Sequence, residues 1–159
     1  HEKIDEWRDS LRGGITVPID NTNVVVTGGV DDVWVTPSGE YIIVDYKATS
    51  KDGEVSLDAD WQIGYKRQME IYQWLFRQNG FSVSNRGYFV YCNGNMDAKA
   101  FDAKLEFRIK LLPYDGNTDW IEEVIHDVHA CLTSDHMPRM SPDCDYCAYR
   151  TAAREKEAV

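Results

Sequence analysis

The sequence predicts a mixed α/β fold in which a central β-sheet is flanked by helices. A Val-rich segment and a second apolar segment, joined by turn residues, predict a β-hairpin in the N-terminal part, and a long segment with apolar residues at helical spacing follows it. Two further strand-like segments and a second helical segment come next. Strands, then a helix, then strands again are typical of a mixed sheet with helices on its flanks.

The N-terminal part carries a short helix and the hairpin. Residues 2–12 suit a helix that Gly13-Gly14 ends. Residues 23–35 have the composition of one strand, and residues 41–47 that of the next. The segment between them, Thr36-Pro37-Ser38-Gly39-Glu40, consists of turn residues, so we expect the two strands to pair as a hairpin.

The rest of the chain alternates between helix and strand signals. Residues 59–79 form the longest helical candidate, and Asn79-Gly80 supplies its stop signal. Its wide apolar stripe implies burial on more than one side. The stripe consists of Trp61, Tyr65, Met69, Tyr72, Leu75 and Phe76, widened by Ile63, Ile71 and Trp74. Loop 48–58, strands 86–92 and 103–112, helix 118–132 and an irregular tail over 133–159 complete a predicted single domain, 1–159.

Composition limits the classes of function. The net charge of −10 argues against a broad nucleic-acid-binding surface, because phosphate contacts need Lys and Arg. Divalent cations held by carboxylates would make the electrostatic potential positive at their site, where a phosphate could then bind. No apolar run is long enough for a membrane span, and the charged N-terminus has no signal region. The four cysteines are interpreted as reduced thiols or metal ligands of a cytoplasmic protein.

The hairpin carries the side chains that could bind a metal ion or take part in catalysis. Side chains alternate along a strand, so Asp45 and Lys47 share one face, and an aspartate inside so apolar a strand needs a task. With Ser38 as the midpoint of the hairpin, Asp31 falls opposite Asp45, with Cβ atoms about 4.5–5.5 Å apart. Two such carboxylates repel unless a proton or a cation lies between them, and a divalent metal removes the conflict. An ion pair at the strand end is the structural alternative.

The same register makes two further predictions. Gly29 would lie opposite Lys47 and leave room for a phosphate to approach closely. Asp32 competes with Asp31 for the metal-facing position. We assign Asp32 to the opposite face, which Val30 and Trp34 share. A slip of one residue in the register would reverse both assignments.

Three motifs in this order resemble the PD-(D/E)xK nuclease superfamily and, within it, the RecB-like branch. They are Gly28-Gly29-Val30-Asp31, Ile43-Val44-Asp45-Tyr46-Lys47 and the Gln-x-x-x-Tyr motif of Gln68-Met69-Glu70-Ile71-Tyr72. The resemblance runs from Gly28 to Arg150 and implies a restriction-endonuclease-like core. It also implies a Mg²⁺- or Mn²⁺-dependent deoxyribonuclease, acting as an exonuclease on single strands or DNA ends in DNA repair, with a helicase or recombination partner.

The resemblance also implies a role for individual residues. Asp31, Asp45 and the main-chain carbonyl of Tyr46 would hold Mg²⁺ or Mn²⁺, which lowers the pKa of a bound water. Lys47 would orient or deprotonate that water and stabilise the developing charge. From the residue pattern alone, Tyr72 would be a core residue and Gln68 a polar residue beside it. The substrate-binding residues that the resemblance implies are Gln68, Tyr72, Lys66 and Arg67.

The C-terminal Cys144 and Cys147 resemble the end of the iron–sulfur site in AddB-type and CRISPR-associated nucleases. A further cysteine of that pattern is replaced by Ala153, and residues 1–91 contain no cysteine. An iron–sulfur cluster would therefore lack half of its ligands. A structural zinc site has suitable ligand types but is not favoured. Its ligands would be Cys131, His136, Cys144 and Cys147.

Two other functions stay open. The chain could be a catalytically inactive nucleic-acid-binding relative, although inactive members usually lose at least one residue of the catalytic set, and Asp31, Asp45 and Lys47 are all present. It could also be an acidic protein-interaction domain that docks through tryptophans. The tryptophans considered for docking are Trp7, Trp34 and Trp120.

Overall fold

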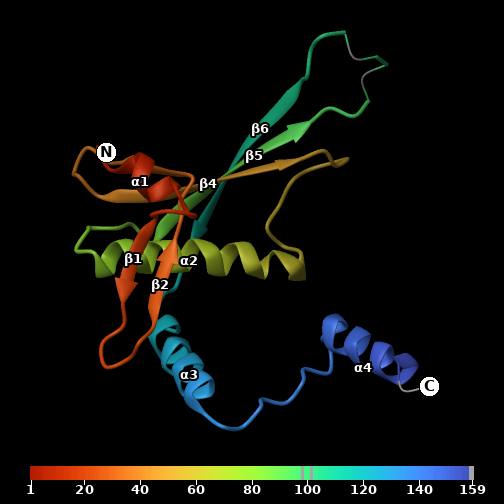
Figure 1. Cartoon of the computed structure of the whole chain (residues 1–159). Helices are drawn as coiled ribbons and strands as arrows, with labels where there is room; N and C mark the ends of the chain where they lie inside the picture. Colours follow the sequence, from red (N-terminus) through yellow and green to blue (C-terminus); the bar gives the residue numbers. More distant parts are fainter. Residues whose placement is uncertain (98, 101, 158–159) are drawn as a thin grey trace. The chain divides into compact units, whose positions relative to one another are not determined.

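The computed structural model describes residues 1–97, 99–100 and 102–157 (Figure 1). It divides into two compact units, His1–Glu122 and Glu123–Val159. None of the helices in the described part is long and apolar enough to cross a membrane. The elements are α1 (Ile4–Arg8), β1 (Ile15–Pro18), β2 (Val25–Gly28), β3 (Asp32–Val35), β4 (Tyr41–Thr49), the 3₁₀ helix η1 (Asp60–Gln62), α2 (Ile63–Gln78), β5 (Arg86–Gly94), β6 (Phe107–Asp115), α3 (Ile121–Thr133) and α4 (Asp145–Glu157).

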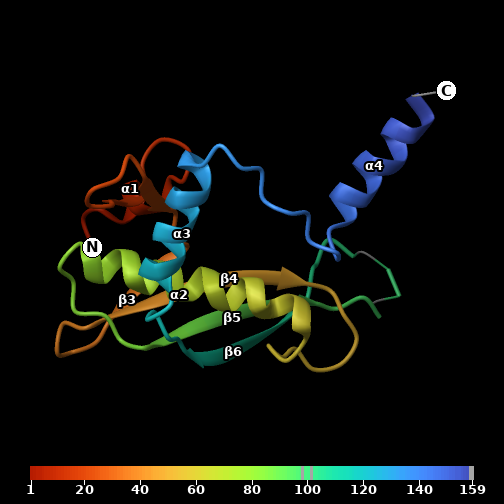
Figure 2. The same ribbon diagram turned by 90° about the horizontal axis from the view of Figure 1, so that it is seen from below.

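The central sheet has the strand order β3-β4-β5-β6, and α2 runs across one of its faces (Figure 2). Strands β4 and β5 are parallel, because α2 forms the crossover between them, whereas the outer pairs are antiparallel. Strands β1 and β2 make a separate two-stranded antiparallel sheet, which also contacts α2. The predicted fold, a mixed sheet flanked by helices, is confirmed.

The predicted hairpin register is confirmed. Val33 pairs with Ile43, and Asp32 pairs with Val44, so the pairs are centred on Ser38. The turn between the strands explains this register. The amide of Thr36 donates to the carbonyl of Glu40 at 2.9 Å, and Gly39 adopts a φ of 85° that residues with a Cβ rarely adopt.

The core of the first unit lies between α2 and the sheet. Met69, Leu75 and Phe76 of α2 are fully buried. Gly87 of β5 lies under Met69, where a Cβ atom would come within 2.4 Å of the sulfur. The prediction that α2 is buried on several sides holds for its C-terminal part, but Trp61 and Ile63 at its start are exposed, so the stripe does not begin there.

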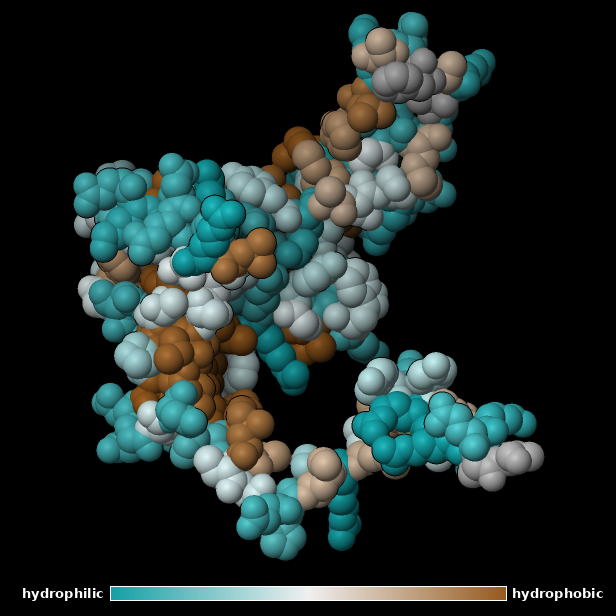
Figure 3. Space-filling model, viewed as in Figure 1, coloured by the Kyte–Doolittle hydropathy of each residue, from teal (hydrophilic) through white to brown (hydrophobic). Residues whose placement is uncertain are grey.

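Apolar side chains also gather at the surface (Figure 3). The view shows them over β1 and β2 and along the β5–β6 hairpin, and the exposed residues there include Val25, Phe107 and Ile109. Of the tryptophans considered for protein docking, Trp7 is only 4% exposed and belongs to the core. Trp120 is partly exposed, and its indole N–H donates to Glu70 at 2.8 Å.

Several boundaries differ from the sequence-based predictions. Strand β1 was not predicted, because four residues after two glycines carry little pattern of their own and pairing with β2 stabilises them. Strand β6 begins at Phe107 and not at residue 103. The prediction of an irregular tail over 133–159 is wrong for Asp145–Glu157, where α4 forms. Its Ala, Arg, Lys and Glu residues favour a helix.

Candidate active site

The two aspartates approach each other at the end of the hairpin. Asp45 lies within β4 and is 3% exposed, while Asp31 immediately precedes β3 and, by continuation of the register, stands opposite it. The amide of Tyr46 donates to Oδ2 of Asp31 at 2.7 Å, which orients that carboxylate toward β4. Burial raises the pKa of Asp45 above its ordinary value, and the charge of Asp31 adds to this, whereas Lys47 opposes it.

Lys47 connects the carboxylates to α2. Its Nζ lies 2.5 Å from Oδ2 of Asp45, yet that oxygen has no partner with hydrogen-bond geometry among the described residues. The contact is therefore an ion pair in which Oδ2 keeps a free lone pair, because the two atoms are close but not aligned for a hydrogen bond. The same ammonium donates to Oε1 of Gln68 at 3.2 Å and lies 4.5 Å from the ring centroid of Tyr65.

A polar row continues along α2. The side-chain amide of Gln68 donates to the hydroxyl of Tyr72 at 2.9 Å, as expected for residues four positions apart on one helix face. Burial raises the pKa of Tyr72, so the phenol keeps its proton. The sequence-predicted residues Asp45, Lys47, Gln68 and Tyr72 therefore form one connected set between β4 and α2.

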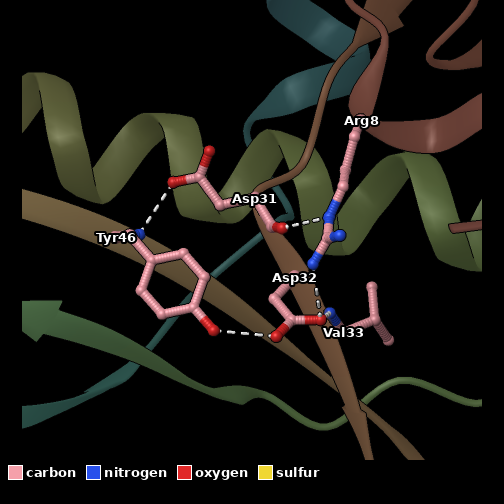
Figure 4. A network of polar contacts seen from close by, with 5 residues as sticks. All are labelled: Arg8, Asp31, Asp32, Val33 and Tyr46. Carbon is pink, nitrogen blue, oxygen red and sulfur yellow. Dashed lines mark hydrogen bonds and ion pairs between the residues drawn. The ribbon is translucent and has the colours of Figure 1, made fainter. Parts of the chain in front are cut away.

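A second network on the other side of the hairpin holds Asp31 in place (Figure 4). Arg8 of α1 donates from Nε to the main-chain carbonyl of Asp31 at 2.7 Å and pairs with Asp32 at 3.4 Å. The hydroxyl of Tyr46 donates to Asp32 at 2.8 Å, and this bond raises the pKa of Tyr46. Asp32 thus lies on the face of Tyr46, opposite to Asp45, as the register implied.

Sequence reasoning did not identify Arg8, because nothing in the spacing of an acidic N-terminal helix reveals which strand it meets. It also left Glu70 without a role. Glu70 is 7% exposed and accepts hydrogen bonds from three groups of β6 and the segment that follows it, so it attaches α2 to that part of the chain. The donors are the hydroxyl of Tyr114, the amide of Asn117 and the indole of Trp120.

Two residues of the predicted site also contact other parts of the fold. Gly29 packs against Ser10, where a Cβ atom would lie 2.7 Å from that of Ser10, so this glycine makes room for the N-terminal segment. Lys66 lies near the ring of Tyr114, at 5.9 Å from its centroid, and Tyr114 belongs to β6, two strands from β4.

Arg67 lies beside a groove that runs along Gln68 and Tyr72. The groove has a volume of about 560 Å³. A glycine is needed at position 28, because a Cβ atom there would lie 2.7 Å from the Tyr72 ring. It is lined by Ser10, Thr27, Gly28, Gly29, Gly64, Arg67, Gln68, Ile71 and Tyr72.

The residues present fit a hard divalent cation. The Asp31 carboxylate is close enough to Asp45 for its charge to raise the pKa of Asp45, and Asp45 has a buried oxygen without a hydrogen-bond partner among the described residues. A strand residue directs its N–H and C=O to the same side, so the carbonyl of Tyr46 faces the side on which its amide meets Asp31. The described residues contain no group of three or more acidic, His or Cys side chains placed to hold a metal ion together, but Mg²⁺ usually binds one or two carboxylates and keeps several waters.

The cysteines of the second unit are close only as a pair. The sulfur atoms of Cys144 and Cys147 lie 2.8 Å apart at the start of α4, and Cys131 is exposed. Within the described ranges no third His, Cys, Asp or Glu side chain joins the pair, so the proposed zinc ligands Cys131 and His136 are not assembled around it.

The fold and the site define a class of α/β domain in which two aspartates and a lysine of one hairpin meet beside a helix. Residues 1–152 match the family model of the PD-(D/E)XK nuclease superfamily, and the chain belongs to this superfamily. Its members are generally nucleases that use divalent metal ions.

A solved structure, the crystal structure of SSO0001, is also similar, with 21% sequence identity and a TM-score of 0.47. The match covers 86% of this chain and 54% of that one, so this chain spans about half the length of that protein. No curated protein matches the chain.

Proposed function

We propose that this domain is a Mg²⁺- or Mn²⁺-dependent deoxyribonuclease of the RecB-like branch that degrades single strands or DNA ends as an exonuclease. The observation that supports the proposal is the ion pair of the buried Asp45 with the ammonium of Lys47, on the strand whose Tyr46 amide donates to the carboxylate of Asp31. In this proposal the domain works with a helicase or recombination partner, which would supply unwound strands.

The proposed chemistry follows from the positions of the side chains. Asp31, Asp45 and the carbonyl of Tyr46 would hold the metal ion, which supplies an activated water and polarises the phosphate. Lys47 is close enough to orient that water through its ammonium and to stabilise negative charge on the phosphate. Gln68 limits the motion of Lys47 by accepting a hydrogen bond from its ammonium at 3.2 Å, and the hydroxyl of Tyr72 accepts one from the Gln68 amide in turn.

The test compares cleavage of end-labelled single-stranded DNA, duplex DNA and RNA with Mg²⁺ or Mn²⁺. We expect Asp45→Ala and Lys47→Ala each to reduce the rate at least about 100-fold, because loss of one preorganised charge-stabilising group costs about that much. Asp52→Asn, in the exposed loop after β4, is the matched control and should retain full activity. Undiminished cleavage by both site variants would contradict the proposal, and an inactive wild-type protein that still binds DNA would favour the inactive relative.

A further inference from the structure

An exposed aromatic pair lies next to the lysine of the site. Trp61 of η1 is 67% exposed, and its ring meets that of Tyr65 at 5.4 Å in an edge-to-face arrangement. Tyr65 in turn lies under the ammonium of Lys47, 4.5 Å from its ring centroid. The row from Asp45 through Lys47 and Tyr65 to Trp61 therefore leads from the carboxylates to the start of α2.

The turn that carries Trp61 is fixed by its neighbour. Gln62 is 5% exposed, and its side-chain amide donates to the carbonyl of Ser56 at 2.7 Å and to the hydroxyl of Tyr91 at 3.4 Å. Its Oε1 accepts the amide of Ala59 at 2.9 Å. A single exposed tryptophan is common on protein surfaces. Here, however, the buried Gln62 anchors the turn that carries the indole, and the ring contacts Tyr65 while staying accessible.

The charge of the chain bears on how such a site would bind a substrate. With a net charge of −10, the chain can make few phosphate contacts, which normally supply most of the affinity for nucleic acids. Stacking of a base on an aromatic side chain contributes about 1–3 kcal/mol and needs no positive charge. Bases of a duplex are already stacked on each other, so only an unpaired base can use an exposed ring in this way.

We propose that Trp61, supported by Tyr65, is a stacking site for an unpaired base of the nucleic-acid strand whose phosphate lies at Lys47. The inference rests on the proposed nuclease function and specifies its substrate: a strand that is unpaired beside the scissile phosphate. Stacking holds the base next to the cut bond, so the platform selects single strands over duplex without reading the sequence.

The experiment measures binding and cleavage separately, on the full chain. Binding of a labelled single strand, the matching duplex and a strand of abasic sites is followed by fluorescence anisotropy with Ca²⁺ in place of Mg²⁺. We expect Trp61→Ala to weaken binding of the single strand about 5- to 150-fold, the range to which a stacking free energy of 1–3 kcal/mol for one base corresponds. Trp61→Phe should retain most of the affinity, and duplex and abasic strands should bind wild type and Trp61→Ala alike.

Trp34→Ala is the matched control, because Trp34 is a partly exposed tryptophan of β3 that lies against Tyr88 and not beside Lys47. Thermal melts confirm that the variants are folded. Unchanged single-strand binding by Trp61→Ala, or equal weakening on all three ligands, would overturn the stacking site even if the wild type cleaves DNA. Selective loss of single-strand binding would support it even if the wild type cleaves nothing, in which case only the nuclease proposal fails.

Discussion

The buried carboxylate of Glu70 gives a prediction whose size can be worked out from the structure. Replacing it by alanine removes the acceptor for three donors: the Tyr114 hydroxyl at 2.6 Å, the Asn117 amide at 3.1 Å and the Trp120 indole at 2.8 Å. A hydrogen bond to a charged group contributes about 1.5–3 kcal/mol net. The donors are only part-buried and regain some solvation, so the three contributions do not add in full.

We therefore expect Glu70→Ala to lower the free energy of unfolding by about 3–5 kcal/mol, the cost typical of breaking a buried charged network. In a protein of this size that corresponds to a fall in Tm of roughly 10 °C. Glu70→Gln should cost less, about 1–2 kcal/mol, because its oxygen can still accept two bonds while its NH₂ group meets the Trp120 donor.

The assay is urea unfolding followed by circular dichroism and tryptophan fluorescence. Glu122→Ala is the control, because Glu122 is exposed and accepts only two longer bonds, at 3.1 and 3.5 Å. Its free energy of unfolding should stay within about 0.5 kcal/mol of wild type. If Glu70→Ala unfolds within 1 kcal/mol of wild type, by the same measurement, the network does not stabilise the fold and the reasoning fails.

Three further predictions concern the site and its surroundings. Asp45→Asn should abolish cleavage yet raise the stability of the metal-free protein by about 0.5–2 kcal/mol in a thermal melt, because burial raises the pKa of Asp45 and so disfavours its charged form; a lower Tm would contradict this. Arg8→Ala should release the Asp31 main chain and so weaken the binding of Mn²⁺. At 100 times its Kd, Mn²⁺ stabilises the folded wild type by about 2.7 kcal/mol, and the rise in Tm that reports this stabilisation should be smaller in the variant. Burial and the bond to Glu70 raise the pKa of Tyr114, so above about pH 10 the folded state keeps a proton that the unfolded state loses, and stability falls as pH rises. That fall should be shallower in Tyr114→Phe, and identical slopes in pH-dependent melts would refute it.

The arrangement of the candidate catalytic residues could be predicted from the sequence because a hairpin is a local structure. Five turn residues between two apolar segments fix the register, and continuing this register by one pair beyond Asp32–Val44 places Asp31 opposite Asp45. The helical spacing of Gln68 and Tyr72 likewise determines that the two side chains share a face. Neither inference needs knowledge of distant parts of the chain.

The supporting residues could not be predicted in this way. Arg8 reaches Asp31 across 23 positions, and Glu70 reaches Trp120 across 50, so their contacts exist only once the sheet and α2 have packed. The neighbours of Lys66 and Gly29 likewise depend on packing, which places Lys66 near Tyr114 and Ser10 against Gly29.

The sequence by itself determined the longest helix, the pairing of the hairpin and its register, because strand and helix periodicity are properties of neighbouring residues. Tertiary structure alone decided the depth at which Asp45 is buried, the attachment of Lys47 to α2 and the exposure of Trp61 beside it. Those depend on which surfaces meet, and a pattern along one chain records which residues could be buried but not what covers them.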